Sequence, residues 1–259
     1  MTHFSRAIVR PPTINFADGL TSVNLGMPDY HAALEQHENY CQVLVDCGLQ
    51  VISLQPDERY PDATFVEDTA ILTEKFGLIT NPGAASRKGE ETEIAKVLEG
   101  FYDAMHSIQT PGTLDGGDIC NADGHFFIGI SHRTNKDGAE QLAGFLKRYG
   151  YSSTMIDIRD TPGILHLKSG IAYLGDDTLL VTKPFAQHEA LQPYRRLVVP
   201  VEHEAYAANC IRVNDAVLFA EGFPATQQLL ESAGYALKVL PVSEFEKMDG
   251  GLSCLSLRF

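Results

Sequence analysis

The sequence lacks any long hydrophobic run. No stretch approaches the roughly 20 apolar residues with which a helix crosses a bilayer. Residues 1–15 also lack the apolar segment of a secretory signal peptide. We therefore expect a cytoplasmic protein that makes no contact with membranes.

Positive charge is scarce as well. Lysine and arginine together number 20, against 34 aspartates and glutamates, and the formal net charge is −14. Nucleic-acid binding needs clustered cations that neutralise phosphates, so this balance argues against nucleic acid as a partner. An acidic chain permits a cationic substrate without proving one, because acidic surfaces usually serve solubility.

The cysteines form no recognisable framework. There are five of them, at positions 41, 47, 120, 210 and 254. The number is odd, no CxxC pair occurs, and no histidines lie at zinc-finger distances from them. We expect free thiols in a reducing compartment. With 259 residues, the chain is long enough to form one α/β domain over residues 1–259 without disulfides.

A repeat is present instead. Apolar strand pairs with tight polar turns recur at residues 70–80, 119–130, 171–182 and 211–220. Each pair is followed by a helical stretch, such as 90–102 or 135–149, and then by a short strand, such as 155–158, 197–201 or 237–240. A fifth helix at 32–46 and strand at 51–54 lack a hairpin, unless the C-terminal strand 254–259 pairs with the N-terminal strand 5–9. That pairing makes five units and predicts a closed ring of repeats.

Polar residues recur just ahead of the first strand of each unit. In chain order they are Glu67 with Asp68, Asp115 with Asp118, His166 with Lys168, Asn209, and Cys254. Equivalent positions in a ring face the same end of its axis, so we expect these side chains to converge. Singly, each is explained as well by a turn or a core position. Together, a cysteine, a histidine and carboxylates favour catalysis in which a thiolate attacks and an imidazole moves protons.

Five segments around these positions share the order and composition of a known family. They are residues 65–68 (FVED), 111–118 (PGTLDGGD), 166–168 (HLK), 207–211 (AANCI) and 249–254 (DGGLSC), with further agreement at 18–20 and 133–135. The chain thereby resembles the dimethylarginine dimethylaminohydrolases (dimethylargininases) of the guanidino-group-modifying, or pentein, superfamily. The resemblance implies an α/β fold, a five-bladed α/β propeller whose active site lies in the central channel.

The resemblance also implies roles for individual residues. Cys254 would be the nucleophile, His166 the proton donor and general base, and Asp115 the acid that orients His166. The substrate-binding residues would be Asp68 and Glu67 at the guanidinium, Arg87 and Arg133 at the α-carboxylate, and Asp62 with the backbone carbonyls of Leu20 and Met248 at the α-amino group.

The implied reaction is hydrolysis of asymmetric dimethylarginine and monomethylarginine to citrulline and dimethylamine or methylamine, through a covalent thiouronium on Cys254. It requires no metal or organic cofactor, and the resemblance suggests a homodimer. Related arginine deiminases carry an aspartate two residues after the catalytic histidine, where this chain has Lys168, and this difference favours a methylated substrate. Two alternatives stay open: an arginine deiminase-like hydrolase of another substituted arginine, and a non-catalytic binding protein on the same fold.

Overall fold

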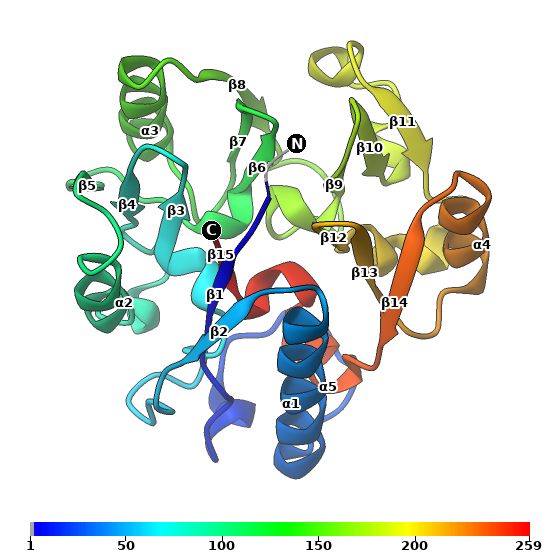
Figure 1. Ribbon diagram of the computed structural model, residues 1–259, viewed down its shortest axis with the longest axis horizontal. Coiled ribbons are helices and arrows are strands. Elements are labelled where there is room, and N and C mark those ends of the chain that lie inside the picture. The colour runs from blue at the N-terminus through cyan, green and yellow to red at the C-terminus, as the bar shows by residue number, and fades with distance from the viewer. Residues whose placement is uncertain (1–2) are drawn as a thin grey trace.

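A computed structural model describes residues 3–259 and arranges their strands in five three-stranded sheets around a common centre (Figure 1). Every sheet repeats one pattern: the inner strand pairs antiparallel with the middle strand, and the middle strand pairs parallel with the outer one. This repeat confirms the predicted five-unit α/β architecture.

Each sheet runs from an inner strand near the centre to an outer strand at the rim. The strands of each sheet are named here from the inner one to the outer one. The first sheet holds β15 (Leu257–Arg258), β1 (Arg6–Val9) and β2 (Gln50–Ser53), and the second holds β3 (Ala70–Leu72), β4 (Gly77–Ile79) and β5 (Met105–Ser107). The third holds β6 (Ile119–Ala122), β7 (His125–Ile130) and β8 (Ser152–Asp157). The fourth holds β9 (Ile171–Gly175), β10 (Thr178–Val181) and β11 (Arg195–Val198), and the fifth β12 (Ile211–Val213), β13 (Ala216–Ala220) and β14 (Ala236–Leu240).

The predicted hairpins form at the predicted turns. In three of them the chain takes a positive φ at aspartate or asparagine: 49° at Asp123, 49° at Asp176 and 53° at Asn214. These residues tolerate the left-handed conformation that tight hairpin turns require. The turn of the remaining hairpin, between β3 and β4, is stabilised by a side chain. The Thr73 hydroxyl accepts hydrogen bonds from the amides of Lys75 and Phe76.

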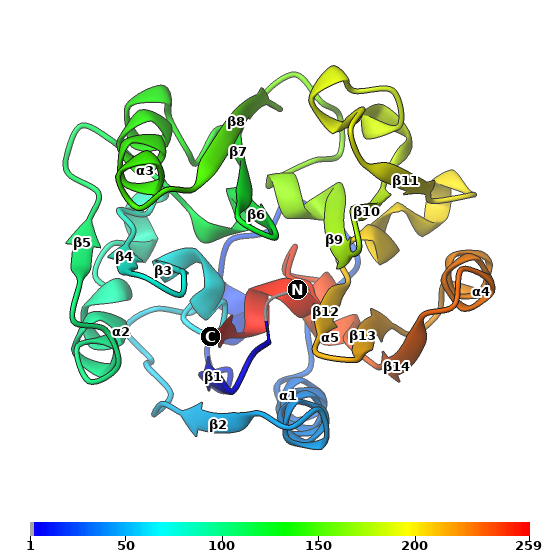
Figure 2. The same ribbon diagram turned by 45° about the horizontal axis from the view of Figure 1, so that its top comes forward.

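Helices connect the middle and outer strands on the outside of the ring, as Figure 2 shows. They are α1 (Tyr30–Asp46), α2 (Glu91–Leu98), α3 (Lys136–Arg148) and α4 (Pro224–Ser232), and a fifth, α5 (Ser243–Glu246), precedes the last turn. The prediction of a helix in the fourth unit is wrong. Two short 3₁₀ turns, Lys183–Phe185 and Glu189–Leu191, form there in place of an α-helix. Pro184 lies inside the first turn, and Pro193 follows the second, so a continuous helix would lose backbone hydrogen bonds.

Within residues 3–259, no helix is both long and apolar enough to span a bilayer.

The two ends of the chain share the first sheet. Ala7 pairs with Arg258 and Ile8 with Leu257, which confirms the predicted pairing that supplies the fifth unit. The C-terminal strand is shorter than predicted. Cys254 does not open a strand but lies in a 3₁₀ turn, Leu252–Leu255, followed by only two strand residues.

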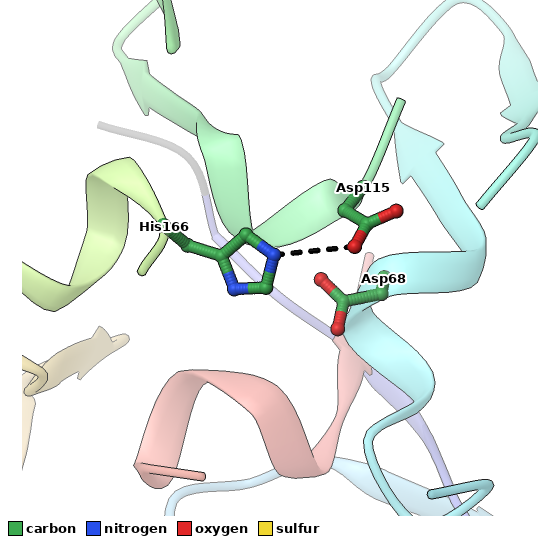
Figure 3. Close-up of side chains that lie close together, drawn as sticks. All are labelled: Asp68, Asp115 and His166. Carbon is green, nitrogen blue, oxygen red and sulfur yellow. Dashed lines mark hydrogen bonds and ion pairs between the residues drawn. The ribbon is translucent and has the colours of Figure 1, made fainter. Parts of the chain in front are cut away.

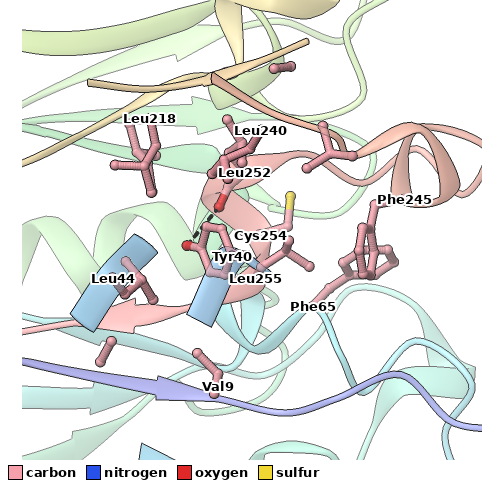
Figure 4. Packing of buried hydrophobic residues seen from close by; sticks show 14 of the residues in the cluster. Val9, Tyr40, Leu44, Phe65, Leu218, Leu240, Phe245, Leu252, Cys254 and Leu255 are labelled. Carbon is pink, nitrogen blue, oxygen red and sulfur yellow. Dashed lines mark hydrogen bonds between the residues drawn. The ribbon is translucent and has the colours of Figure 1, made fainter. Parts of the chain in front are cut away.

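The hydrophobic core is divided into five clusters, and each lies between two neighbouring sheets. The cluster between the fifth and first sheets contains Leu44, Leu218, Leu252 and Leu255 (Figure 4). The last two flank Cys254 and have no exposed surface. Their burial, at about 25 cal/mol for each Å² of apolar surface, anchors the turn that carries the cysteine.

A 3₁₀ turn precedes the inner strand of every unit. The five turns are η2 (Val66–Thr69), η4 (Gly116–Asp118), η5 (Leu167–Ser169), η8 (Glu202–Ala208) and η9 (Leu252–Leu255). Neighbouring turns contact one another: η2 touches η9 and η4, and η5 touches η4 and η8. Residues separated by nearly two hundred positions are thus brought to one end of the ring, as the repeat predicted.

Candidate active site

A small cavity of about 30 Å³ lies where these turns meet. We call it the Cys254 cavity. Nine of the ten predicted site residues line it, together with Phe65, Leu165, Asp249 and Gly250. Those nine are Leu20, Asp62, Asp68, Arg87, Asp115, Arg133, His166, Met248 and Cys254. The tenth, Glu67, does not.

His166 and Asp115 form a hydrogen-bonded pair in the cavity. The His166 Nε2 atom lies 3.2 Å from Asp115 Oδ2 (Figure 3). Asp115 is held in turn, because its Oδ1 accepts a hydrogen bond from the Gly83 amide at 2.8 Å and its own amide donates to Thr134 Oγ1. Since Nε2 faces Asp115, Nδ1 is the ring nitrogen left to exchange protons with reactants.

The imidazole of His166 is surrounded by carboxylates. Burial by itself lowers its pKa, but Asp68, Asp118 and Asp115 together outweigh burial and raise the pKa from 6.5 to about 9. His166 is therefore protonated at neutral pH and ready to act as an acid.

Asp68 stays ionised in the same cavity. Burial raises its pKa, but His166, the Arg87 guanidinium and the Gly117 amide outweigh burial and lower the pKa to about 2. The Gly117 amide donates to Asp68 Oδ1 at 2.7 Å, and Arg87 Nη1 donates to Asp68 Oδ2 at 2.6 Å. A Cβ on Gly117 would lie 2.8 Å from the imidazole ring and 3.0 Å from the Asp68 carboxylate, so this position needs glycine.

The two predicted carboxylate-binding arginines differ in their surroundings. Arg87 is buried and contacts Asp68 on one side and Glu90 on the other, with Nη2 2.7 Å from Glu90 Oε2. Arg133 is half-buried, and within residues 3–259 it forms no salt bridge. Sequence reasoning missed Glu90, although its spacing of three from Arg87 was a signal, since such residues are neighbours on a helical turn.

Cys254 offers its thiol to the cavity but does not ionise readily. Its residue is 9% exposed. Burial, together with the charges of Glu67 and Asp68, raises the pKa of the thiol from 9.0 to about 12. Only the thiolate is a strong nucleophile, and a further positive charge beside Cys254 would lower the pKa of its thiol.

The three residues predicted for the α-amino group, Leu20, Asp62 and Met248, line the same cavity. Asp62 is buried, and its carboxylate accepts the Leu20 amide at 3.1 and 3.2 Å. Burial raises the pKa of Asp62. A Cβ on Gly19 would lie 2.6 Å from Asp62 Oδ1 and 3.2 Å from Met248 Cε, so glycine permits the close approach of this loop. Leu20 itself is 39% exposed and forms an outer wall of the cavity.

Glu67 lies in a different environment from its neighbour Asp68. Its Oε1 atom is 2.7 Å from Lys168 Nζ and 3.1 Å from Arg258 Nη2. These three side chains line a second cavity of about 180 Å³ that runs along the inner strands, and we call it the Lys168 cavity. Lys168 therefore does not place a cation in the Cys254 cavity.

Asp68, Asp115 and His166 also bring one side-chain nitrogen or oxygen each within 4.8 Å of one another. Such a group can hold a metal ion when its atoms are free. In this cavity Arg87 already neutralises Asp68, and His166 is protonated beside Asp115. A protonated imidazole has no lone pair for a metal, so the arrangement suits proton transfer.

Known proteins have similar sequences and the same fold. A family model described as "N,N dimethylarginine dimethylhydrolase, eukaryotic" matches residues 29–209. An N(G),N(G)-dimethylarginine dimethylaminohydrolase of Pseudomonas aeruginosa is 42% identical over 257 residues, which cover 99% of this chain and all of that protein.

Two solved structures agree with this fold over almost the whole chain. A cysteine-to-serine mutant of the Pseudomonas aeruginosa enzyme complexed with citrulline superposes with a TM-score of 0.96, at 41% identity and with both chains covered completely. A dimethylarginine dimethylaminohydrolase adduct with S-methyl-L-thiocitrulline superposes with a TM-score of 0.95, at 42% identity, covering 99% of this chain and all of that one. The protein therefore belongs to the dimethylarginine dimethylaminohydrolase family.

Proposed function

We propose that the protein hydrolyses asymmetric dimethylarginine and monomethylarginine to citrulline, releasing dimethylamine or methylamine. One observation carries the proposal: a thiol, a protonated imidazole with its orienting carboxylate, and an ionised carboxylate line one cavity. A binding protein needs none of this acid–base chemistry. The names of the relatives agree with the reaction.

The substrate is held at both of its ends. Asp68 accepts hydrogen bonds from the guanidinium, Asp62 and the Leu20 and Met248 carbonyls take the α-amino group, and Arg133 takes the α-carboxylate. Arg87, whose guanidinium is shared between Asp68 and Glu90, contributes a second positive charge near the same carboxylate. A charge-assisted hydrogen bond is roughly twice as strong as a neutral one, so the two ends fix the position of the reacting carbon.

The chemistry follows from the charges. The cationic guanidinium enters between Cys254 and Asp68 and stabilises the thiolate, and the thiol proton passes to solvent. Sγ then forms a bond to the guanidinium carbon, and the bond from that carbon to the dimethylamine nitrogen breaks as His166 donates its proton to the leaving nitrogen. This leaves an S-alkylthiouronium on Cys254.

Hydrolysis reverses the proton movement. Neutral His166 takes a proton from a water molecule, whose oxygen bonds to the same carbon. The carbon–sulfur bond breaks, the new hydroxyl group passes its remaining proton to the departing sulfur, citrulline forms, and the Cys254 thiol and protonated His166 return. Asp115 keeps the imidazole oriented through both halves, so that Nδ1 exchanges the proton each time.

Three finer proposals accompany this one. Residues 1–259 act as one catalytic unit, the protein works in the cytoplasm, and it forms a homodimer. Light scattering of the purified protein tests the last of these, and a monomer at micromolar concentration would refute it.

The test of function is citrulline formation from asymmetric dimethylarginine, with arginine in a parallel reaction and Cys254→Ser as the control. We expect citrulline from dimethylarginine and none above background from Cys254→Ser. Citrulline from arginine alone would make the protein a deiminase. The absence of citrulline from both substrates would refute the proposal.

A further inference from the structure

Asp118 is a buried carboxylate next to the site that the reaction itself does not use. It ends the η4 turn, has no exposed surface, and is not among the residues that line the Cys254 cavity. Its Oδ1 atom accepts a hydrogen bond from the Leu167 amide at 3.0 Å, directly after His166. Its Oδ2 atom accepts one from Ser131 Oγ at 2.6 Å. One side chain thus contacts two separate turns.

The Ser131 hydroxyl extends this contact to Arg133. Ser131 Oγ accepts hydrogen bonds from the Arg133 amide at 2.9 Å and from the Thr134 amide at 3.0 Å. A hydroxyl has one proton to donate and two lone pairs, so donation to Asp118 completes its capacity. The backbone of Arg133 is therefore fixed to Asp118 through a single hydroxyl.

The packing around Asp118 leaves no free space. A Cβ on Gly129 would lie 3.0 Å from Asp118 Oδ1 and 2.9 Å from the Leu167 Cβ. Glycine in β7 is what allows the strand, the carboxylate and the His166 turn to approach so closely. A displaced turn would therefore have to move the strand as well.

We propose that Asp118 is a positioning residue that holds the His166 turn and the Arg133 turn in one fixed relation. The inference rests on the proposed function, in which His166 acts at the guanidinium end of the substrate and Arg133 binds its carboxylate end. A substrate reaches both only when the distance between the two turns is constant. Misplacement of reacting groups by about 1 Å costs on the order of 100-fold in rate.

The charge of Asp118 acts on His166 too. Several charged or titratable groups face the imidazole: Asp68 from η2, Asp115 and Asp118 from η4, Arg87 beside Asp68, Arg133 from the neighbouring turn, and Cys254 from η9. Asp118 is one of the three carboxylates that raise the pKa of His166. Loss of its charge therefore lowers that pKa, an effect that a purely structural role would not produce.

Two variants separate the charge of Asp118 from its hydrogen bond with Ser131. In Asp118→Asn the amide oxygen still accepts the Leu167 amide, but its NH₂ group faces a Ser131 hydroxyl that has no lone pair free. Ser131→Ala keeps the Asp118 carboxylate and removes the hydroxyl that joins it to the amides of Arg133 and Thr134. Glu204→Gln is the matched control, because Glu204 is equally buried but caps α4, accepting the amides of Ala225 and Thr226.

We would measure the His166 pKa by NMR titration, steady-state kinetics with asymmetric dimethylarginine, L-citrulline affinity by calorimetry, and thermal unfolding. We expect Asp118→Asn to lower the His166 pKa and to reduce kcat/KM on the order of 10- to 100-fold. Ser131→Ala should raise KM and weaken citrulline binding about 10-fold, and it should lower kcat and the His166 pKa less than Asp118→Asn does, because the carboxylate remains. Glu204→Gln should lower the melting temperature alone.

Two results would overturn the proposal. One is an Asp118→Asn variant with the same His166 pKa and kcat/KM as Glu204→Gln, and the other is unchanged KM and citrulline affinity in Ser131→Ala. If Asp118→Asn does not fold, Ser131→Ala decides alone. If the unmodified protein forms no citrulline, the proposed function fails, whereas the His166 titration, which needs no substrate, still decides whether Asp118 acts on His166.

Discussion

The Cys254 cavity and the Lys168 cavity are lined by neighbouring residues of the same turns. Asp68 and His166 face the first, whereas Glu67 and Lys168 face the second. Both cavities contain ionic contacts, and both contain buried cysteines. In the Cys254 cavity the carboxylates outnumber the cations around one imidazole. In the Lys168 cavity two cations, Lys168 and Arg258, enclose one carboxylate.

The cysteines of the two cavities show what makes a thiol a candidate nucleophile. Burial raises the pKa of Cys120 to about 11 and that of Cys210 to about 12, much as in Cys254. The thiol pKa therefore does not distinguish the three residues. Cys254 differs because it shares a cavity with Asp68, which can attract a cation, and with His166, which can supply a proton.

After the complete loss expected of Cys254→Ser, the largest effect we predict comes from the orienting carboxylate. Asp115→Asn removes the charge beside His166 Nε2 and allows the imidazole to turn, so kcat should fall about 10³-fold. Steady-state citrulline formation measures this loss. An effect below about tenfold would mean that His166 is oriented by Asp68 instead.

The carboxylate end of the substrate gives the next largest effect. Arg133→Gln removes a charged donor from the Cys254 cavity, and loss of such a hydrogen bond is worth about 1.5–3 kcal/mol. We expect KM for dimethylarginine to rise about 10- to 100-fold with kcat changed far less. An unchanged KM would assign carboxylate binding to Arg87 alone.

The pH dependence reports His166 directly. Because its pKa is raised to about 9, kcat at saturating dimethylarginine, where the bound cation has already ionised Cys254, should be constant near neutrality and fall about tenfold for each pH unit above 9. The same raised pKa stabilises the folded state below pH 6.5, and this contribution is lost as the pH rises through about 9. An alkaline limb near pH 6.5 would show that the carboxylates do not act on His166.

The Lys168 cavity should give the smallest effect on activity. Lys168→Met leaves Glu67 with Arg258 as its partner, so we expect KM and kcat within about threefold of the unmodified protein and a loss of roughly 1–3 kcal/mol in unfolding free energy. Chemical denaturation and kinetics test both parts. A large rise in KM would contradict the separation of the two cavities.

The sequence was sufficient to predict the repeat because hairpin turns and apolar periodicity are local. Asp123 and Asn214 adopt the left-handed turns that their residue types favour, and α3 begins and ends within one residue of its predicted bounds. The fourth unit was harder to predict, because two prolines outweigh an otherwise helical composition. The predicted strand at Cys254 was too long, because a 3₁₀ turn and a short strand have similar patterns of apolar residues.

Which way a side chain points was less predictable than where it lies along the chain. Glu67 and Asp68 are adjacent in η2, yet their side chains point in different directions. Glu67 contacts Lys168, and Asp68 contacts Arg87. The proposed effect of Lys168 on substrate choice does not follow from its position, because its amine contacts Glu67. The contact of Asp118 with the Leu167 amide joins segments far apart in sequence, so no local pattern reveals it, whereas the spacing of three between Arg87 and Glu90 was a local signal for their contact.

The most direct test of the central claim is to detect the covalent intermediate. The protein is mixed with asymmetric dimethylarginine, quenched in acid within one turnover, digested and analysed by mass spectrometry. We expect a thiouronium adduct on Cys254 that appears and decays at the rate of citrulline formation, with Cys120 and Cys210 unmodified. Citrulline formation with no adduct on Cys254 throughout the time course, or an adduct on another cysteine, would contradict the account.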